Sequence, residues 1–159
     1  MELNLNRHLM NNLIAPVMSR LALADARLDG PLARMLVFGT MIVSARLAVT
    51  KNRTGHPRGP FGIRDDEYDR VYYGFLHDSR PDLRPCVEFY LVPRVDVYEQ
   101  LESNKHLACC VCRLIYLSRI PVLPGVVSEL AHAWKTAYEL YDGAESDFVE
   151  SVSGYQQLQ

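Results

Sequence analysis

Residues 32–49 read LARMLVFGTMIVSARLAV, and this stretch decides the fold class. Its few polar side chains point in different directions around a helix, so the helix would be apolar on every side. A helix of this kind is buried in a protein core or in lipid. Only eleven residues separate Arg34 from Arg46, fewer than the ~20 apolar residues that a bilayer-spanning helix needs. We therefore expect a buried core helix and no membrane partner.

Amphipathic patterns on both sides predict further helices around this one. Apolar residues recur at helical spacing over residues 3–28, 66–77 and 127–141. Pro16 is expected to end or kink the first of these helices, because proline has no N–H group to donate. The sequence thus predicts a mainly α fold, a compact bundle of about five to seven helices around the central helix 32–49.

One region leaves the fold class open. Residues 86–92 are short, rich in Val, Phe and Tyr, and followed by a proline, which favours a strand. Residues 107–117 are almost continuously apolar and fit a buried helix or a buried strand. Between them, Asp96 can cap a short helix that runs to about Glu102. We expect one short strand near 86–92 and a helix at 107–117, and the alternative is an α+β fold in which the two segments pair.

The chain has 159 residues, a length that suits one domain. We expect a single globular helical domain over residues 1–143. Residues 144–159 are expected to form an acidic and polar C-terminal tail or a short docking helix.

Charge is distributed unevenly along the chain, although the net charge is only -2. Residues 1–64 carry nine Lys or Arg against three Asp or Glu, a net +6. Residues 65–159 carry eight against sixteen, a net -8. Such an asymmetry can orient a protein on a partner or let copies meet head to tail.

The loop at residues 51–64 is the first candidate site. Three glycines and two prolines exclude a regular element, and its basic side chains are suited to phosphate contacts. A base of single-stranded nucleic acid could stack on its one aromatic ring. The alternative is a solvated linker or a loop that docks onto another protein. The residues expected to bind nucleic acid or a partner are Lys51, Arg53, His56, Arg58, Phe61 and Arg64.

The four cysteines form the second candidate site. Cys109, Cys110 and Cys112 lie within four positions, which does not resemble the disulfide framework of a secreted protein. We therefore expect an intracellular, reducing compartment, the cytoplasm or the nucleus. Zinc takes four N or S ligands, and the set that could supply them is Cys86, His106, Cys109 and Cys112. The preferred interpretation is that these are core thiols and that the protein needs no cofactor.

The third candidate is a group of three tyrosines, Tyr68, Tyr72 and Tyr73, which give the helix at 66–77 an aromatic face. Aromatic side chains with polar tips are common in protein interfaces. Just before them, Asp65, Asp66, Glu67 and Asp69 could attract a divalent cation, but the dipole of a helix start explains them more simply.

Catalytic and nucleotide-binding motifs are missing from the sequence, including the P-loop, the dinucleotide fingerprint, the nucleophile elbow and the zinc-protease motif. An enzyme is therefore not the expected class. The leading hypothesis is a non-enzymatic interaction protein, a small structural subunit or adaptor of a larger assembly. The terminal Leu158-Gln159 resembles a cut made by chymotrypsin-like viral cysteine proteases, so a viral assembly is one expected setting. The alternatives are a nucleic-acid-binding protein and a zinc-stabilised regulatory protein.

Overall fold

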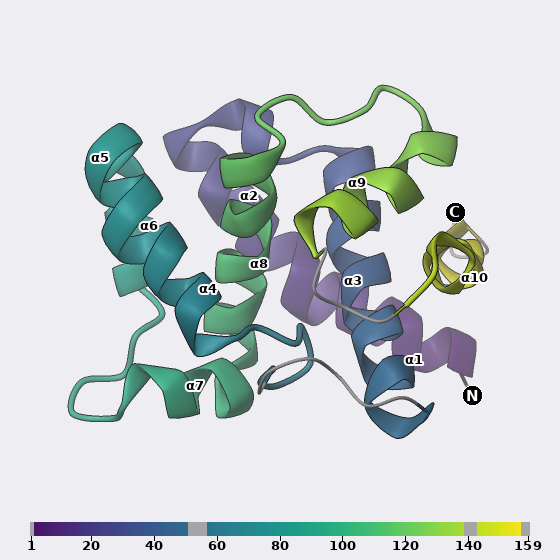
Figure 1. Ribbon diagram of the computed structural model, residues 1–159, viewed down its shortest axis with the longest axis horizontal. Coiled ribbons are helices and arrows are strands. Elements are labelled where there is room, and N and C mark those ends of the chain that lie inside the picture. The colour runs from purple at the N-terminus through teal and green to yellow at the C-terminus, as the bar shows by residue number, and fades with distance from the viewer. Residues whose placement is uncertain (1, 51–56, 139–142, 157–159) are drawn as a thin grey trace.

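The computed structural model describes residues 2–50, 57–138 and 143–156, and it is mainly helical, as the sequence predicts (Figure 1). Leu158-Gln159 lies outside the described residues. The first half contains α1 (Glu2–Leu9), the π-helical η1 (Met10–Ile14), α2 (Ala15–Ala24), the 3-10 turn η2 (Ala26–Leu28) and α3 (Pro31–Thr50). The middle contains α4 (Asp65–Asp69), the π-helical η3 (Arg70–Leu76), α5 (His77–Ser79), the 3-10 turn η4 (Pro81–Leu83) and α6 (Arg84–Glu88). The rest contains α7 (Val97–Ser103), α8 (Lys105–Arg119), the 3-10 turn η5 (Val127–Glu129), α9 (Leu130–Ala137) and α10 (Glu145–Gln156).

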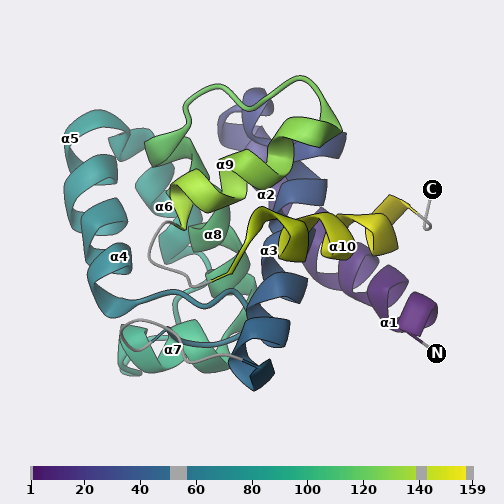
Figure 2. The ribbon, with the colours of Figure 1, turned by 45° about the vertical axis from the view of Figure 1, so that its right-hand side comes forward.

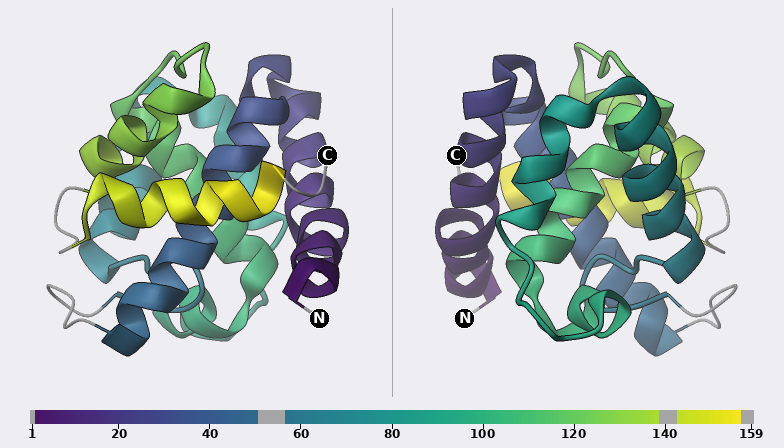
Figure 3. Two further views of the ribbon diagram at one scale, coloured as in Figure 1. Left: turned by 90° about the vertical axis from the view of Figure 1, so that its right-hand side faces the viewer. Right: turned by 90° about the vertical axis from the view of Figure 1, so that its left-hand side faces the viewer.

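The N-terminal segments α1, η1 and α2 run as one helical rod, seen upright beside the rest of the protein in Figure 3. Pro16 does not end this rod, because it occupies the first turn of α2, where its missing N–H group matters least. The turn just before it is the π-helical η1. A π-helical turn gives other hydrogen-bond partners to backbone groups at the point where the proline interrupts the regular helical pattern. The rod buries Leu13, Ile14, Val17 and Leu21.

The helix predicted at 32–49 is α3, and most of its side chains between Ala33 and Ser44 are buried. It shares the centre of the protein with α8, which contacts the N-terminal rod, η3, α3, α6, α7 and α9 (Figures 1 and 2). Every residue from 107 to 117 is buried. The prediction that α3 alone is central was therefore incomplete. Because residues 107–117 form a helix, the α+β alternative is wrong.

The strand predicted near residues 86–92 is also wrong. Residues 84–88 form α6, which has Pro85 in its first turn, a position for which the fixed φ of proline is well suited. The chain then turns through hydrogen bonds from Phe89 N to Pro85 O and from Tyr90 N to Val87 O. Within the described ranges, the only β-type pairing is an isolated bridge between Arg58 and Ile63. The predicted cap at Asp96 is confirmed, because its carboxylate accepts a hydrogen bond from Glu99 N at the start of α7.

At the C-terminal side, α10 lies across α3 and also contacts α9 (Figure 2). Its Phe148 is fully buried, and the Phe148 ring stacks on that of Trp134 with 5.8 Å between centroids. Gly39 of α3 permits this close approach, because the Phe148 ring occupies the space that a Cβ atom would need. Among the described residues, no helix has both the length and the apolar character required to cross a membrane.

Candidate functional site

The basic loop offers less to a nucleic acid than its sequence suggests. Lys51, Arg53 and His56 lie outside the described residues. Arg58 is paired with Asp65 at 2.7 Å, and Arg64 with Asp66 at 2.8 Å, so both guanidinium groups are engaged within the chain.

Phe61 corrects the stacking prediction. Its ring has no exposed surface, because it belongs to the hydrophobic core together with Ile63. The loop carries both side chains into the protein after a turn in which Gly59 and Gly62 adopt the positive φ values that glycine tolerates. A base cannot stack on Phe61 in this conformation.

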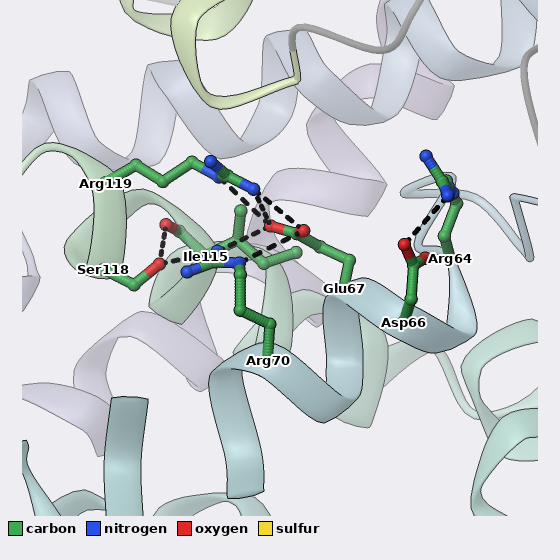
Figure 4. A network of polar contacts seen from close by, with 7 residues as sticks. All are labelled: Arg64, Asp66, Glu67, Arg70, Ile115, Ser118 and Arg119. Atoms are coloured by element: carbon green, nitrogen blue, oxygen red, sulfur yellow. Dashed lines mark hydrogen bonds and ion pairs between the residues drawn. The ribbon is translucent and has the colours of Figure 1, made fainter. Parts of the chain in front are cut away.

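The carboxylates at the start of α4 hold elements of the chain together (Figure 4). Glu67 accepts hydrogen bonds from Arg70 at 2.6 Å and from Arg119 at 3.0 Å. Burial raises the pKa of Glu67, but the two guanidinium groups outweigh it, and the net pKa is lowered. Arg70 also donates to Ser118, so the network joins α4 and η3 to the end of α8. The geometry is that of an interhelical clamp.

The tyrosines are divided between core and surface. Tyr68 and Tyr72 are buried and stacked, with 5.5 Å between ring centroids, so the prediction that both form a protein interface is wrong for this conformation. They lie on the side of the helix that faces the core, and the Tyr72 hydroxyl donates to Glu88. The ring of Tyr73 packs edge-on against that of Tyr72, with 5.0 Å between centroids, but Tyr73 is exposed, so of the three it remains available for a partner.

The proposed zinc ligands are not brought together. Cys109 and Cys112 are buried within α8, and burial raises the pKa of both thiols, to about 12 for Cys112. His106 is exposed, and its ring stacks on Tyr90 instead of turning toward the thiols. In the part of the chain that the structure describes, no three or more His, Cys, Asp or Glu side chains are grouped so that they could hold a metal ion.

Much of the charge asymmetry is neutralised inside the chain. Arg46 of the basic half pairs across the fold with Glu150 of α10 in the acidic half. Together with the pairs of Arg58 and Arg64, this contact leaves a smaller net field to attract a partner than the sequence suggests.

A groove between the N-terminal rod and the segment 92–106 is the best-formed candidate site. It has a volume of about 700 Å³. One wall is made by α1 and η1, and the other by the α6–α7 connection, α7 and the start of α8. We call it the α1 groove. Its lining includes Leu5, His8, Asn12, Val92, Val95 and Lys105.

Buried amide side chains fix the wall opposite α1. Gln100 is 2% exposed and accepts a hydrogen bond from Val92 N at 2.9 Å. It also donates to the carbonyl oxygens of Val92 and Val95, at 3.0 and 2.9 Å. Between these residues, Arg94 adopts a positive φ of 67°, which is uncommon for a residue other than glycine and persists where its surroundings determine it.

Asn104 completes this wall. Its amide donates to Tyr90 O at 2.7 Å, and its side-chain oxygen caps α8 by accepting from Leu107 N. The position of the wall is therefore set by hydrogen bonds before any ligand arrives.

The chemistry of the α1 groove is apolar and mildly basic. Leu5 and Val92 keep more than half of their surface exposed, and Val95 keeps 44%. Lys105, His8 and His106 line the groove, and among the side chains that the structure describes no carboxylate does. The sequence analysis placed His106 only in a possible zinc set and missed the groove, because the walls of the groove come from segments about eighty residues apart. No periodic pattern within the polar segment 92–106 predicts that it lies beside α1.

Comparison with known proteins adds nothing to these observations. No family model, no curated protein and no solved structure matches the chain. A proposal about function therefore depends on the surfaces and pockets of this protein alone.

Proposed function

We propose that the protein is a non-enzymatic interaction protein, a small subunit or adaptor, that holds an acidic segment with large apolar side chains from a partner protein in the α1 groove. The observation that carries this proposal is the gathering of exposed apolar side chains at one place. Leu5, Val92 and Val95 line the groove and keep between 44% and 56% of their surface exposed. Contiguous exposed apolar surface on a globular protein is typical of an interaction site.

The charge of the groove favours an acidic partner segment. Lys105 contributes a positive charge, the imidazoles of His8 and His106 can donate hydrogen bonds, and none of the described side chains in the lining is a carboxylate that would repel an acidic side chain. Apolar residues of the segment would contact Leu5, Val92 and Val95, and its acidic residues would face the basic side chains. Because the wall at 92–95 is already fixed, binding would cost little ordering of the groove.

The proposal is tested by selecting peptides from a random library displayed on phage against the whole protein. The selected peptides are expected to combine large apolar residues with Asp or Glu, and their binding is expected to weaken as salt rises. Binding of the labelled peptides is then measured by fluorescence polarisation. Selection of basic or uncharged peptides only would contradict the proposal.

Two matched variants locate the binding. Leu5→Glu places a carboxylate inside the groove, and we expect at least about tenfold weaker binding. Leu23→Glu makes the same change on α2, where the side chain is 84% exposed and does not line the groove, and we expect unchanged binding. Equal binding by wild type and Leu5→Glu would overturn the proposal. A stable homodimer that light scattering detects in wild type and that Leu5→Glu dissociates would show that a second copy, and not a foreign segment, covers the groove.

A further inference from the structure

Arg113 is a buried cation that feels the charges of Asp25 and Asp29 but contacts neither carboxylate directly among the described residues. It lies in the middle of α8 and is only 2% exposed. Its Nε donates to the carbonyl oxygen of Leu28 at 2.8 Å, but its Nη1 has no hydrogen-bond partner. Over the described ranges, no carboxylate forms an ion pair with it. Burial lowers the pKa of Arg113 to about 10, so the group remains charged at neutral pH.

A buried charge of this kind is costly unless another group compensates it. Arg113 lines a pocket of about 400 Å³, which lies on the side of the fold away from α7, next to the connection that follows α8. Arg27 and the start of α3 also line it, and the segment 121–124 forms its apolar wall. We call it the Arg113 pocket.

The start of α3 adds hydrogen-bond donors to the same pocket. The first bond of the helix runs from Arg34 N to Gly30 O, so the N–H groups of Leu32 and Ala33 precede the ladder and have no intrahelical acceptor. Both residues line the pocket, and α3 is a twenty-residue helix whose dipole favours an anion at this end. In the part of the chain that is described, no side chain caps these two groups.

The carboxylate nearest to this helix start is already engaged. Asp29 lines the pocket, but its two oxygens accept hydrogen bonds from Arg34 Nε and Nη2, both at 2.8 Å. Arg27 is exposed and pairs with Asp25 at 3.0 Å. Among the described residues that line the pocket, the one positive charge left without a paired carboxylate is that of Arg113.

The pocket wall can admit a ligand to the guanidinium. The wall segment connects α8 to η5, and within the described structure no backbone–backbone hydrogen bond involves residues 121–125. Val122 is 84% exposed, and Pro121, Leu123 and Pro124 complete an apolar surface beside the charged groups. A displacement of this segment therefore breaks no backbone–backbone hydrogen bond of the described structure.

From the unpartnered Nη1 of Arg113, the free N–H groups at the start of α3 and the apolar wall, we propose that the Arg113 pocket binds a small organic monocarboxylate with a short apolar chain. One guanidinium group without a direct carboxylate contact matches one negative charge, and the nearby carboxylates of Asp25 and Asp29 would repel a doubly charged phosphate more strongly than a carboxylate. The carboxylate would accept from Nη1 and from the N–H groups of Leu32 and Ala33, and the apolar chain would contact Val122 and Leu123. This site is separate from the α1 groove and does not depend on the function proposed for it.

The test is a titration of the ¹⁵N-labelled full chain with sodium hexanoate, followed by NMR. We expect saturable shifts centred on the amides of Leu32, Ala33 and Val122. Hexanamide, the neutral isostere, is expected to produce no saturable shift, and inorganic phosphate is expected to bind more weakly than hexanoate. Shifts by hexanamide equal to those by hexanoate, tighter binding of phosphate, or no shift with hexanoate would each overturn the proposal.

Variants separate the site from general destabilisation. Arg113→Met removes the buried charge at similar volume, so it should fold at least as stably as wild type and lose hexanoate binding. Val122→Asp places a carboxylate at the exposed rim, and we expect at least about tenfold weaker binding. Its matched control is Val126→Asp, an exposed position on the same connection that does not line the pocket, and it should bind as wild type does. Undiminished binding by Val122→Asp or by a folded Arg113→Met would refute the proposed site.

Discussion

Gly39→Ala offers the sharpest test of how α10 is seated on α3. A Cβ atom at position 39 would lie 2.6 Å from Cε2 and Cζ of Phe148 and 3.2 Å from a methyl group of Val152. The Phe148 ring cannot move aside easily, because it is fully buried and stacked on Trp134 with 21° between the ring planes. The added methyl group therefore forces a displacement of the ring or of α10 as a whole.

The magnitude follows from two opposing effects. Overpacking of a well-packed site costs about 1–3 kcal/mol, whereas alanine is favoured over glycine inside a helix by about 1 kcal/mol. We expect a net loss of about 1 kcal/mol in the free energy of unfolding. In a Phe148→Leu background the clashing Cε2 and Cζ atoms are gone, so Gly39→Ala should gain about 1 kcal/mol. The coupling between the two sites is then about 2 kcal/mol.

The assay is urea unfolding followed by the fluorescence of Trp134, the only tryptophan in the chain. Gly74→Ala is a matched control, because a Cβ atom at position 74 meets nothing within 4 Å and alanine should stabilise that helix. If Gly39→Ala stabilises the wild-type chain as much as Gly74→Ala does, the Phe148 ring does not confine position 39. The packing of α10 described above would then be refuted.

Three further outcomes are expected. Glu67→Gln should cost about 2 kcal/mol at neutral pH, because Glu67 accepts charge-assisted hydrogen bonds from two arginines. The pKa of Glu67 is lowered from 4.5 in the folded state, so the stabilisation by its carboxylate is complete above pH 4.5. This stabilisation should vanish as the pH falls through the pKa of the folded state, and urea unfolding at a series of pH values measures the loss. Of the four thiols, only that of Cys86 is partly exposed, and burial raises its pKa, so one equivalent should react slowly with Ellman's reagent in the folded protein and the other three only as the protein unfolds. Reaction of two or more thiols before unfolding would contradict the burial of α8. Gln100→Ala removes three hydrogen bonds to the wall of the α1 groove and should accelerate amide hydrogen exchange at Val92, whereas unchanged exchange would show that the wall is held in another way.

The helical class could be predicted because its signals are local. The uniform apolar character of residues 32–49 and the cap at Asp96 are visible in short windows of sequence, and both match helices of the structure. The strand predicted at 86–92 failed although its signal was also local. There, the Val, Phe and Tyr content indicated a strand, but Pro85, just before the segment, has a fixed φ that suits the first turn of a helix, and α6 begins at Arg84.

The candidate sites could not be predicted in the same way, because they depend on contacts between distant segments. Phe61 has the composition of a stacking platform, and only the packed structure shows that its ring is in the core. The α1 groove requires that Leu5 lie opposite Val92, and no pattern within either segment specifies this. Arg113 is one charged residue in an apolar run, and its missing partner becomes visible only when every neighbour is in place.

Both candidate sites are built on α8. Lys105 and His106 at its start line the α1 groove, and Arg113, about two turns later, lines the other pocket. A substitution in the buried part of α8 would disturb both sites, and its effects on the two sites could not be told apart. The informative substitutions are those at Leu5 and Val122, because each residue is exposed and lines one site only. Because the buried residues between the sites are closely packed, and close-packed interiors resist small displacements, α8 should behave as a rigid support. We therefore expect Leu5→Glu to leave hexanoate binding unchanged and Val122→Asp to leave peptide binding unchanged. A change of tenfold or more in either cross-measurement, without loss of stability, would mean that α8 has two arrangements and transmits the occupancy of one site to the other.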